Sequence, residues 1–190
     1  KKKSLMIVGI VLVLSMLLTA CGGSKSTNVS TDKLTVATSS DATTLDPAAQ
    51  NDSFAANIMA QIYDGLVEID QDGNVHEKLA ESYETTDNLT FTFHLKKGVK
   101  FHNGEELKAS DVKFSFERAL ASPAVSHIFA DIDPNSLETP DDYTFKFTLS
   151  QPYAGVISAI CHPAAFIVSE KAVKEAGDNY ETHPVGTGAF

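Results

Sequence analysis

Apolar and polar residues alternate along two stretches of the chain. In residues 89–95, LTFTFHL, Phe91 and Phe93 fall on one face of an extended chain and the threonines fall on the other. Residues 144–149, TFKFTL, repeat this alternation around two further phenylalanines. Each stretch predicts a half-buried strand, and the matching aromatic faces predict that the two strands are neighbours in one antiparallel sheet.

Helical spacing takes over after the Asn103-Gly104 dipeptide, which favours a tight turn. The apolar positions of the following segment are Val112, Phe116, Ala119 and Leu120. They predict an amphipathic helix, and Arg118 lies largely off the apolar stripe, where we expect it to reach water. Similar patterns predict strands over residues 34–38 and 66–69, and helices over residues 54–63, 156–160 and 169–177.

The first residues have the pattern of an export signal. Three lysines precede residues 5–18, an apolar run that is too short for a spanning helix, which needs about 20 apolar residues. We therefore predict a signal peptide over residues 1–20. Residues 21–33 contain mostly small and polar residues without periodicity, and they predict a flexible linker.

Charge and composition narrow the classes of partner. The 190 residues are 43% apolar, and the formal charge is −10. Because the only basic cluster lies in the predicted signal peptide, the remaining chain is still more acidic and would repel phosphate backbones. We therefore expect no nucleic-acid partner.

Residues 92–104, TFHLKKGVKFHNG, continue into Ala109-Ser110-Asp111-Val112, and this run closely resembles the signature of the extracytoplasmic solute-binding proteins of family 5. These proteins are the peptide- and nickel-binding subunits of ABC importers. The resemblance extends from about Leu34 to Phe190. Where the family usually has a capping Thr, this chain has Lys108, so we expect the helix cap to move to Ser110 or to be lost, at a cost of about 1 kcal/mol.

The resemblance implies an α/β fold with two lobes, of the type II periplasmic-binding class with an extra inserted domain, and only its amino-terminal part would be present. Residues 34–50 would begin the first lobe, residues 51–183 would form the inserted smaller domain, and residues 184–190 would return to the first lobe, with a strand that begins near Gly186. Family members also have a short helix at residues 77–82 and an edge strand at residues 83–85.

In family members the segment after the Leu-Asp-Pro turn lines the ligand cleft. Here that turn is Leu45-Asp46-Pro47, and the implied ligand-binding residues are Ala49, Gln50, Asn51, Asp52 and Ser53. Small polar side chains and free backbone groups suit a buried peptide, whose own backbone needs partners. The alternative is an ordinary loop in which Asp52 or Ser53 caps the next helix.

The implied function is capture of oligopeptides or dipeptides and their delivery to the permease and ATPase subunits of an ABC importer. The protein would be a monomer without catalytic residues, cofactor or metal. Nickel, haem and oligosaccharides are alternative ligands within the family. Leu18-Thr19-Ala20-Cys21 resembles a bacterial lipobox, which implies that Cys21 carries lipid and tethers the protein outside the cytoplasm, at the cell membrane. A structural or adhesive surface lipoprotein would share this tether.

Other candidate chemistry is weaker. Ser110 and Lys113 fit a Ser-x-x-Lys acyl-enzyme pattern, but its companion motifs are missing. Asp70, Asp72, Asn74 and Glu81 imitate a calcium loop with its glycine misplaced. His162 is the most plausible nickel ligand of the six histidines, and Cys161 is expected to be a small buried apolar residue.

Overall fold

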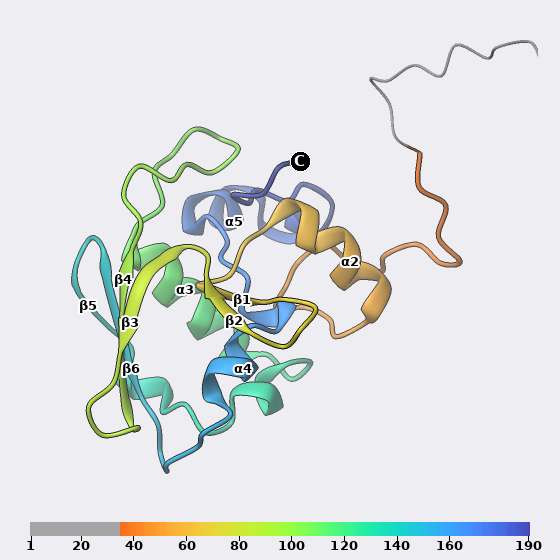
Figure 1. Cartoon of the computed structure of the whole chain (residues 1–190). Helices are drawn as coiled ribbons and strands as arrows, with labels where there is room; N and C mark the ends of the chain where they lie inside the picture. The colour runs from red at the N-terminus through yellow and green to blue at the C-terminus, as the bar shows by residue number, and fades with distance from the viewer. Residues whose placement is uncertain (1–34) are drawn as a thin grey trace, which may run out of the picture. The chain divides into compact units, whose positions relative to one another are not determined.

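An antiparallel sheet in the order β3-β4-β6-β5 organises the computed structural model, which describes residues 35–190. Its strands are β3 (Ala80–Glu84), β4 (Thr90–Leu95), β5 (Glu138–Asp141) and β6 (Thr144–Thr148). Phe91 lies opposite Phe147, and Phe93 lies opposite Phe145. The predicted pairing of the two aromatic strands is therefore confirmed (Figure 1). The predicted signal peptide, the linker and Cys21 lie outside the described residues.

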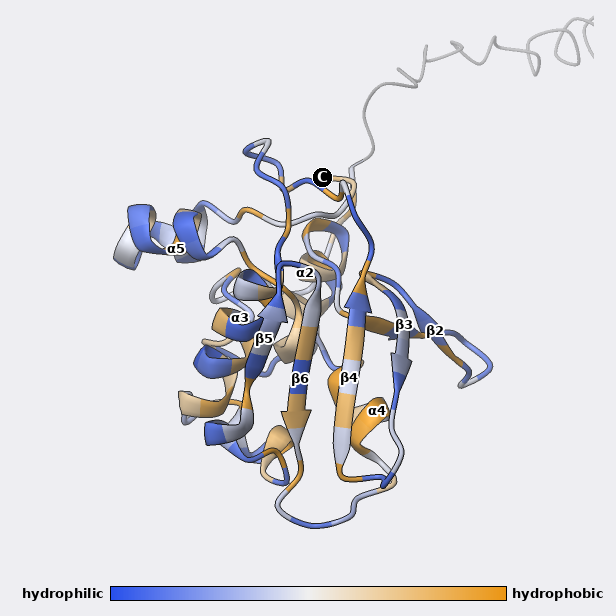
Figure 2. Ribbon diagram, turned by 90° about the vertical axis from the view of Figure 1, so that its left-hand side faces the viewer, coloured by the Kyte–Doolittle hydropathy of each residue, from blue (hydrophilic) through white to orange (hydrophobic). Residues whose placement is uncertain are grey.

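Helices cover one face of this sheet, and Figure 2 looks onto the other face. The covering helices are α3 (Ala109–Ala121) and the short α4 (Val156–Ile160). Phe116 of α3 is 2% exposed, and its ring centroid lies 5.0 Å from that of Phe145 and 6.1 Å from that of Phe147. The open face carries polar residues such as His94. Buried and more exposed residues therefore alternate along β4, as the period-2 pattern predicts.

A second, smaller core lies under helix α2 (Ser53–Ile62) and helix α5 (Glu170–Ala176). Its buried members are Ala55, Met59, Tyr63, Val168, Ala172 and Tyr180. A two-stranded hairpin, β1 (Val67–Ile69) and β2 (Val75–Glu77), follows α2. Four 3-10 turns complete the described part: η1 (Ser126–Phe129), η2 (Pro134–Ser136), η3 (Pro163–Ala165) and η4 (Gly177–Thr182). The helices predicted at residues 54–63, 156–160 and 169–177 are confirmed.

Three predicted elements are wrong. The helix expected at residues 77–82 is instead the end of β2 and the start of β3, because pairing with β1 and β4 determines the local conformation there. Strands were expected at residues 34–38 and from about Gly186 onward, but residues 35–38 and 186–190 form none. An extended segment becomes a strand only beside another strand, and these two segments have no strand neighbour among the described residues.

At the start of α3 the side-chain cap is lost, which is one of the two outcomes that the sequence predicts. Lys108 occupies the N-cap position, while Ser110 lies inside the first turn and is exposed. The cap has not moved to Ser110. Instead, the Lys108 N–H donates to Asp111 Oδ2 over 3.0 Å, which is one half of a capping box supplied from the third helical residue.

Among residues 35–190, no helix combines the length and the apolar character that crossing a membrane requires.

Candidate ligand-binding loop and its anchor

The Leu45-Asp46-Pro47 turn begins the candidate site, and its aspartate is buried. Asp46 is 6% exposed, and its Oδ1 accepts the Ala48 N–H over 3.1 Å. The Asp46 carbonyl accepts the Ala49 N–H over 3.0 Å, and the Asp46 N–H donates to the hydroxyl of Thr44. These local bonds fold the chain back on itself directly before residues 49–53.

Arg118 of α3 holds this turn from a distance of 72 residues in sequence. Its Nη1 lies 3.0 Å from Asp46 Oδ1, and its Nη2 lies 2.5 Å from Asp46 Oδ2, which is the bidentate geometry of an Arg–carboxylate pair. The two side chains are 23% and 9% exposed. Arg118 thus reaches water only in part, as its position off the apolar stripe allows, and its guanidinium also compensates a buried carboxylate.

Two buried tyrosines tie the same turn to the end of the chain. The Tyr63 hydroxyl donates to the Leu45 carbonyl over 3.0 Å, and the Tyr180 hydroxyl donates to the Val185 carbonyl over 3.2 Å. The two hydroxyl oxygens lie 3.1 Å apart. Burial raises the pKa of both phenols, so both keep the hydrogen that they donate.

The five implied ligand-binding residues lie together at the start of α2, but they are not equally free. Asp52 is the N-cap of α2. Its Oδ1 accepts the N–H groups of Phe54, over 2.8 Å, and Ala55, over 3.1 Å. Gln50 bonds to the Asp52 N–H and to Met59 Sδ. Ala49, Asn51 and Ser53 are exposed. The capping alternative thus holds for Asp52, and three residues of the loop remain open to solvent.

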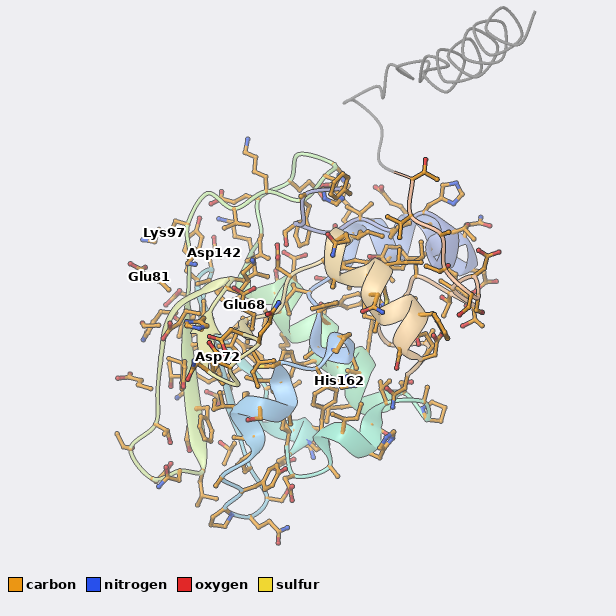
Figure 3. All side chains as sticks on the ribbon, turned by 45° about the vertical axis from the view of Figure 1, so that its right-hand side comes forward. Glu68, Asp72, Glu81, Lys97, Asp142 and His162 are labelled. Atoms are coloured by element: carbon orange, nitrogen blue, oxygen red, sulfur yellow. The ribbon has the colours of Figure 1, made fainter. Side chains whose placement is uncertain are left out.

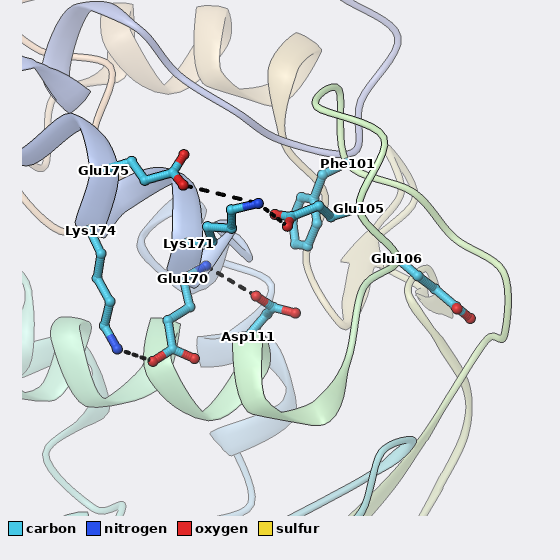
Figure 4. A pocket seen from close by; sticks show the side chains of 8 residues that line it. All are labelled: Phe101, Glu105, Glu106, Asp111, Glu170, Lys171, Lys174 and Glu175. Carbon is cyan, nitrogen blue, oxygen red and sulfur yellow. Dashed lines mark hydrogen bonds and ion pairs between the residues drawn. The ribbon is translucent and has the colours of Figure 1, made fainter.

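A hollow of about 370 Å³ lies between the Phe101–Glu106 loop, the start of α3 and α5 (Figure 4). Its lining residues are Phe101, Glu105, Glu106, Asp111, Glu170, Lys171, Lys174 and Glu175. Its size suits a small ligand. Both of its lysines are already paired, however, since Lys171 Nζ lies 2.7 Å from Glu105 and Lys174 Nζ lies 2.5 Å from Glu170. We therefore assign no ligand to this hollow.

The other candidate residues have structural surroundings. His162 accepts the Ala164 N–H at Nδ1, and burial lowers the pKa of its imidazole. Figure 3 shows it well apart from the acidic side chains of Glu81 and Asp142. Within residues 35–190, no three His, Cys, Asp or Glu side chains are grouped as metal ligands.

The remaining motifs have similar explanations. Lys113, the second member of the Ser-x-x-Lys pattern, lies 3.8 Å from Glu117, and Ser110 is exposed on the first turn of α3. Asp70 of the calcium-like loop accepts three hydrogen bonds from Asp72 and Asn74, as in an ordinary turn. The Cys161 thiol is partly buried, and burial raises its pKa, so it stays a protonated thiol.

The comparisons with known proteins agree with this fold. The family described as "Bacterial extracellular solute-binding proteins, family 5 Middle" matches residues 74–190, more than half of the sequence. The chain belongs to this family. Its resemblance to family 5, first seen in residues 92–112, is thereby confirmed.

Individual members of family 5 resemble the chain over most of its length. It is 37% identical over 160 residues to the glutathione-binding protein GsiB of Pectobacterium atrosepticum. The aligned residues are 82% of this chain and 30% of GsiB. The chain thus spans about 30% of the length of the curated relatives it matches.

Solved structures show the same α/β periplasmic binding fold. The periplasmic binding protein AgaA of A. tumefaciens R10, in complex with agropinic acid, matches with a TM-score of 0.72 and 36% identity over 79% of this chain and 31% of AgaA. Listeria monocytogenes OppA, bound to peptide, matches with a TM-score of 0.72 and 27% identity over 77% of this chain and 33% of OppA. The predicted fold class is confirmed.

Sequence reasoning found the Leu-Asp-Pro turn but missed what anchors it. Arg118, Tyr63 and Tyr180 were not identified as site residues. The available signal was an aspartate in a turn flanked by apolar residues, which needs a cationic partner if it is buried. Nothing in the local sequence says which arginine or lysine supplies that charge.

Proposed function

We propose that this chain belongs to the extracytoplasmic solute-binding component of an ABC importer, which captures small peptides and delivers them to the permease. Membership of family 5 is the observation that carries this proposal. The similarity to OppA bound to peptide and to the glutathione-binding GsiB supports a peptide ligand. Neither capture nor delivery requires chemistry on the ligand, so the proposed role is not that of an enzyme.

The proposed cleft wall consists of Ala49, Gln50, Asn51, Asp52 and Ser53. Asp52 and Gln50 would stabilise the loop, because their side chains already bond within it. Asn51 and Ser53 would face the ligand, since both are exposed and each side chain can donate and accept a hydrogen bond. A peptide recognised through its backbone would leave its side chains little constrained, which gives broad ligand tolerance.

The proposed domain division places the start of the first lobe at residues 34–50, the smaller domain at 51–183 and the return at 184–190. One observation supports it. The Leu45 N–H donates to the Glu181 carbonyl over 3.0 Å, so the two segments that precede the proposed crossings are hydrogen-bonded to each other.

Calorimetry on the full-length protein tests the ligand. Titration with a mixed pool of di- to pentapeptides, and with glutathione alone, should release heat. Asn51→Ala should weaken binding by about tenfold, the worth of one well-made hydrogen bond. Asn57→Ala, on the exposed side of α2, is the matched control and should bind as the unmodified protein does.

The outcome that overturns the peptide assignment is also specific. No heat with any peptide, together with tight binding of agropinic acid, a nickel chelate, haem or an oligosaccharide, would move the protein to another ligand class within family 5. No binding of any of these solutes would overturn the solute-binding role and favour a structural or adhesive lipoprotein.

Membrane attachment is a separate part of the proposal. We infer that the mature protein begins at Cys21, carries lipid there and stays with the membrane fraction outside the cytoplasm. Cys21→Ala should release the protein or leave the precursor uncut, whereas Cys161→Ala should change neither. Mass spectrometry that found unmodified Cys21 inside a longer chain would contradict this part alone.

A further inference from the structure

The last residues of the chain, 186–190, are held between two parts of the described unit. On one side lies the loop that carries His102, and on the other lies the carboxyl end of α2 with Asp64 after it. These contacts join residues more than 80 positions apart in sequence. The segment is not a strand, so sheet pairing does not account for these hydrogen bonds.

His102 makes three of the bonds. Its backbone N–H donates to the Gly186 carbonyl over 2.9 Å, and its ring Nδ1 accepts the Gly186 N–H over 3.3 Å. Because a backbone N–H can only donate, Nδ1 carries no hydrogen, and the neutral ring must carry it on Nε2. Nε2 lies 2.9 Å from the Gly188 carbonyl and donates to it. One imidazole thus fixes two residues of the segment.

On its other side, the segment is hydrogen-bonded to Asp64 and to the end of α2. The Thr187 hydroxyl donates to Asp64 Oδ2 over 2.8 Å. The Gly188 N–H donates to the Ile62 carbonyl over 2.8 Å, and the Phe190 N–H donates to the Gln61 carbonyl over 3.1 Å. The two carbonyls belong to the last turn of α2, whose carbonyl groups have no partner within the helix. The segment therefore also completes the end of α2.

Two glycines allow this close approach. A Cβ at position 186 would lie 2.0 Å from the Ile62 carbonyl oxygen, and a Cβ at position 188 would lie 2.6 Å from the Gln61 carbonyl oxygen. Both distances are far below contact distance and involve backbone atoms that cannot turn aside. Only glycine fits either position, so the residue types at 186 and 188 follow from the bonds around them.

We propose that His102 and Asp64 are positioning residues, which clamp residues 186–188 and make the crossing between the smaller domain and the first lobe rigid. This inference rests on the proposed function, and it assigns to the crossing the role of orienting the proposed cleft wall. A clamped crossing does not bend, so the Ala49–Ser53 wall keeps its orientation toward the remainder of the cleft before the ligand arrives. Such preorganisation improves affinity because less freedom is lost on binding.

Hydrogen exchange on the 190-residue chain, followed residue by residue by NMR, tests the clamp without any ligand. His102→Ala removes the acceptor of the Gly186 N–H, and we expect this amide to exchange about tenfold faster. His102→Asn keeps an acceptor oxygen near the position of Nδ1 and should restore most of the protection. His94→Ala, on the open face of β4, is the control and should leave Gly186 unchanged.

Two results would overturn the clamp. One is an unchanged Gly186 exchange rate in His102→Ala. The other is a ring ¹⁵N spectrum of the unmodified chain in which Nδ1, rather than Nε2, carries the hydrogen. Either result is independent of ligand binding, so it leaves the proposed function standing.

A binding experiment on the full-length protein tests the positioning role. His102→Ala and Thr187→Val should each weaken binding several-fold, mainly through faster dissociation, while His94→Ala should not. If the unmodified protein binds and both variants bind equally well, the positioning role is wrong. If the unmodified protein binds no solute, the proposed function fails while the exchange result still decides the clamp.

Discussion

The sheet core and the loop region around Asp46 are stabilised by different means. The sheet core is apolar. The buried ring of Phe147 stacks on the rings of Phe93 and Phe116, and the ring of Phe145 lies tilted against those of Phe116 and Phe147. The loop region instead relies on a few polar bonds, above all the pair between Asp46 and Arg118. Apolar packing tolerates many substitutions of similar volume, whereas a bidentate ion pair tolerates almost none.

The same difference decides how each region can change. A close-packed core resists deformation and suits a rigid platform. A loop held by specific polar contacts can keep its backbone groups exposed and still have one conformation. We therefore regard the sheet with α3 as the platform, and the turn around Asp46 as the support for the proposed ligand-binding residues 49–53.

The largest effect should come from the platform. Phe116→Ala should lower the free energy of unfolding by about 3–5 kcal/mol, because it leaves a cavity among aromatic rings. Urea unfolding measures the loss. Phe54→Ala is the control, since Phe54 is 43% exposed and should cost well under 1 kcal/mol. Equal losses in the two variants would mean that the sheet core is not closely packed around Phe116.

The next largest effect should come from the anchor. Arg118→Met should cost about 2–3 kcal/mol, less than for a fully buried pair, because the guanidinium keeps some contact with water. Lys113→Met, which breaks an exposed pair on the same helix, should cost at most about 0.5 kcal/mol. Similar losses from the two substitutions would contradict a special role for the Asp46 pair.

A smaller effect is expected at the tyrosine pair. Tyr63→Phe leaves the Leu45 carbonyl without its donor and should cost about 1 kcal/mol in unfolding free energy. Tyr153→Phe, at a tyrosine that is 44% exposed, should cost nothing measurable. If Tyr63→Phe is also neutral, the hydroxyl does not help to hold the turn.

The smallest effect concerns pH and compares the chain with Asp111→Asn. Burial raises the pKa of Asp111, so the folded chain holds that proton more tightly than the unfolded chain does. The contribution of Asp111 is therefore fully present below the unfolded pKa of about 3.9, and it is lost as pH rises through the higher folded pKa. Stability relative to Asp111→Asn should fall over this window in urea titrations. A rise would show that the hydrogen bonds from Lys108 and Glu170 outweigh burial.

The platform could be predicted from the sequence because its signals are local. Alternation around Phe91 and Phe93, and helical spacing around Phe116, each report burial within a few residues. The loop anchor could not be predicted, since Asp46 and Arg118 are 72 residues apart and Tyr63 and Tyr180 are 117 residues apart. The helix expected at residues 77–82 failed for the same reason, because pairing with distant strands decided its conformation.

The resemblance to family 5 supplied what the local patterns could not. It implied the fold class and drew attention to residues 49–53, although it did not show that Asp52 would be engaged as a helix cap. It also implied a short helix at residues 77–82, which this chain does not form. A family pattern thus predicts the architecture better than it predicts individual elements.

Hydrogen exchange with and without ligand tests most directly whether residues 49–53 form the cleft wall. The measurement uses the full-length protein, saturated with whichever peptide releases heat in calorimetry. We predict that the amides of residues 49–53 become about tenfold or more slower to exchange, while those of β4 stay unchanged. Tight peptide binding that leaves residues 49–53 at their unliganded exchange rates would contradict the account.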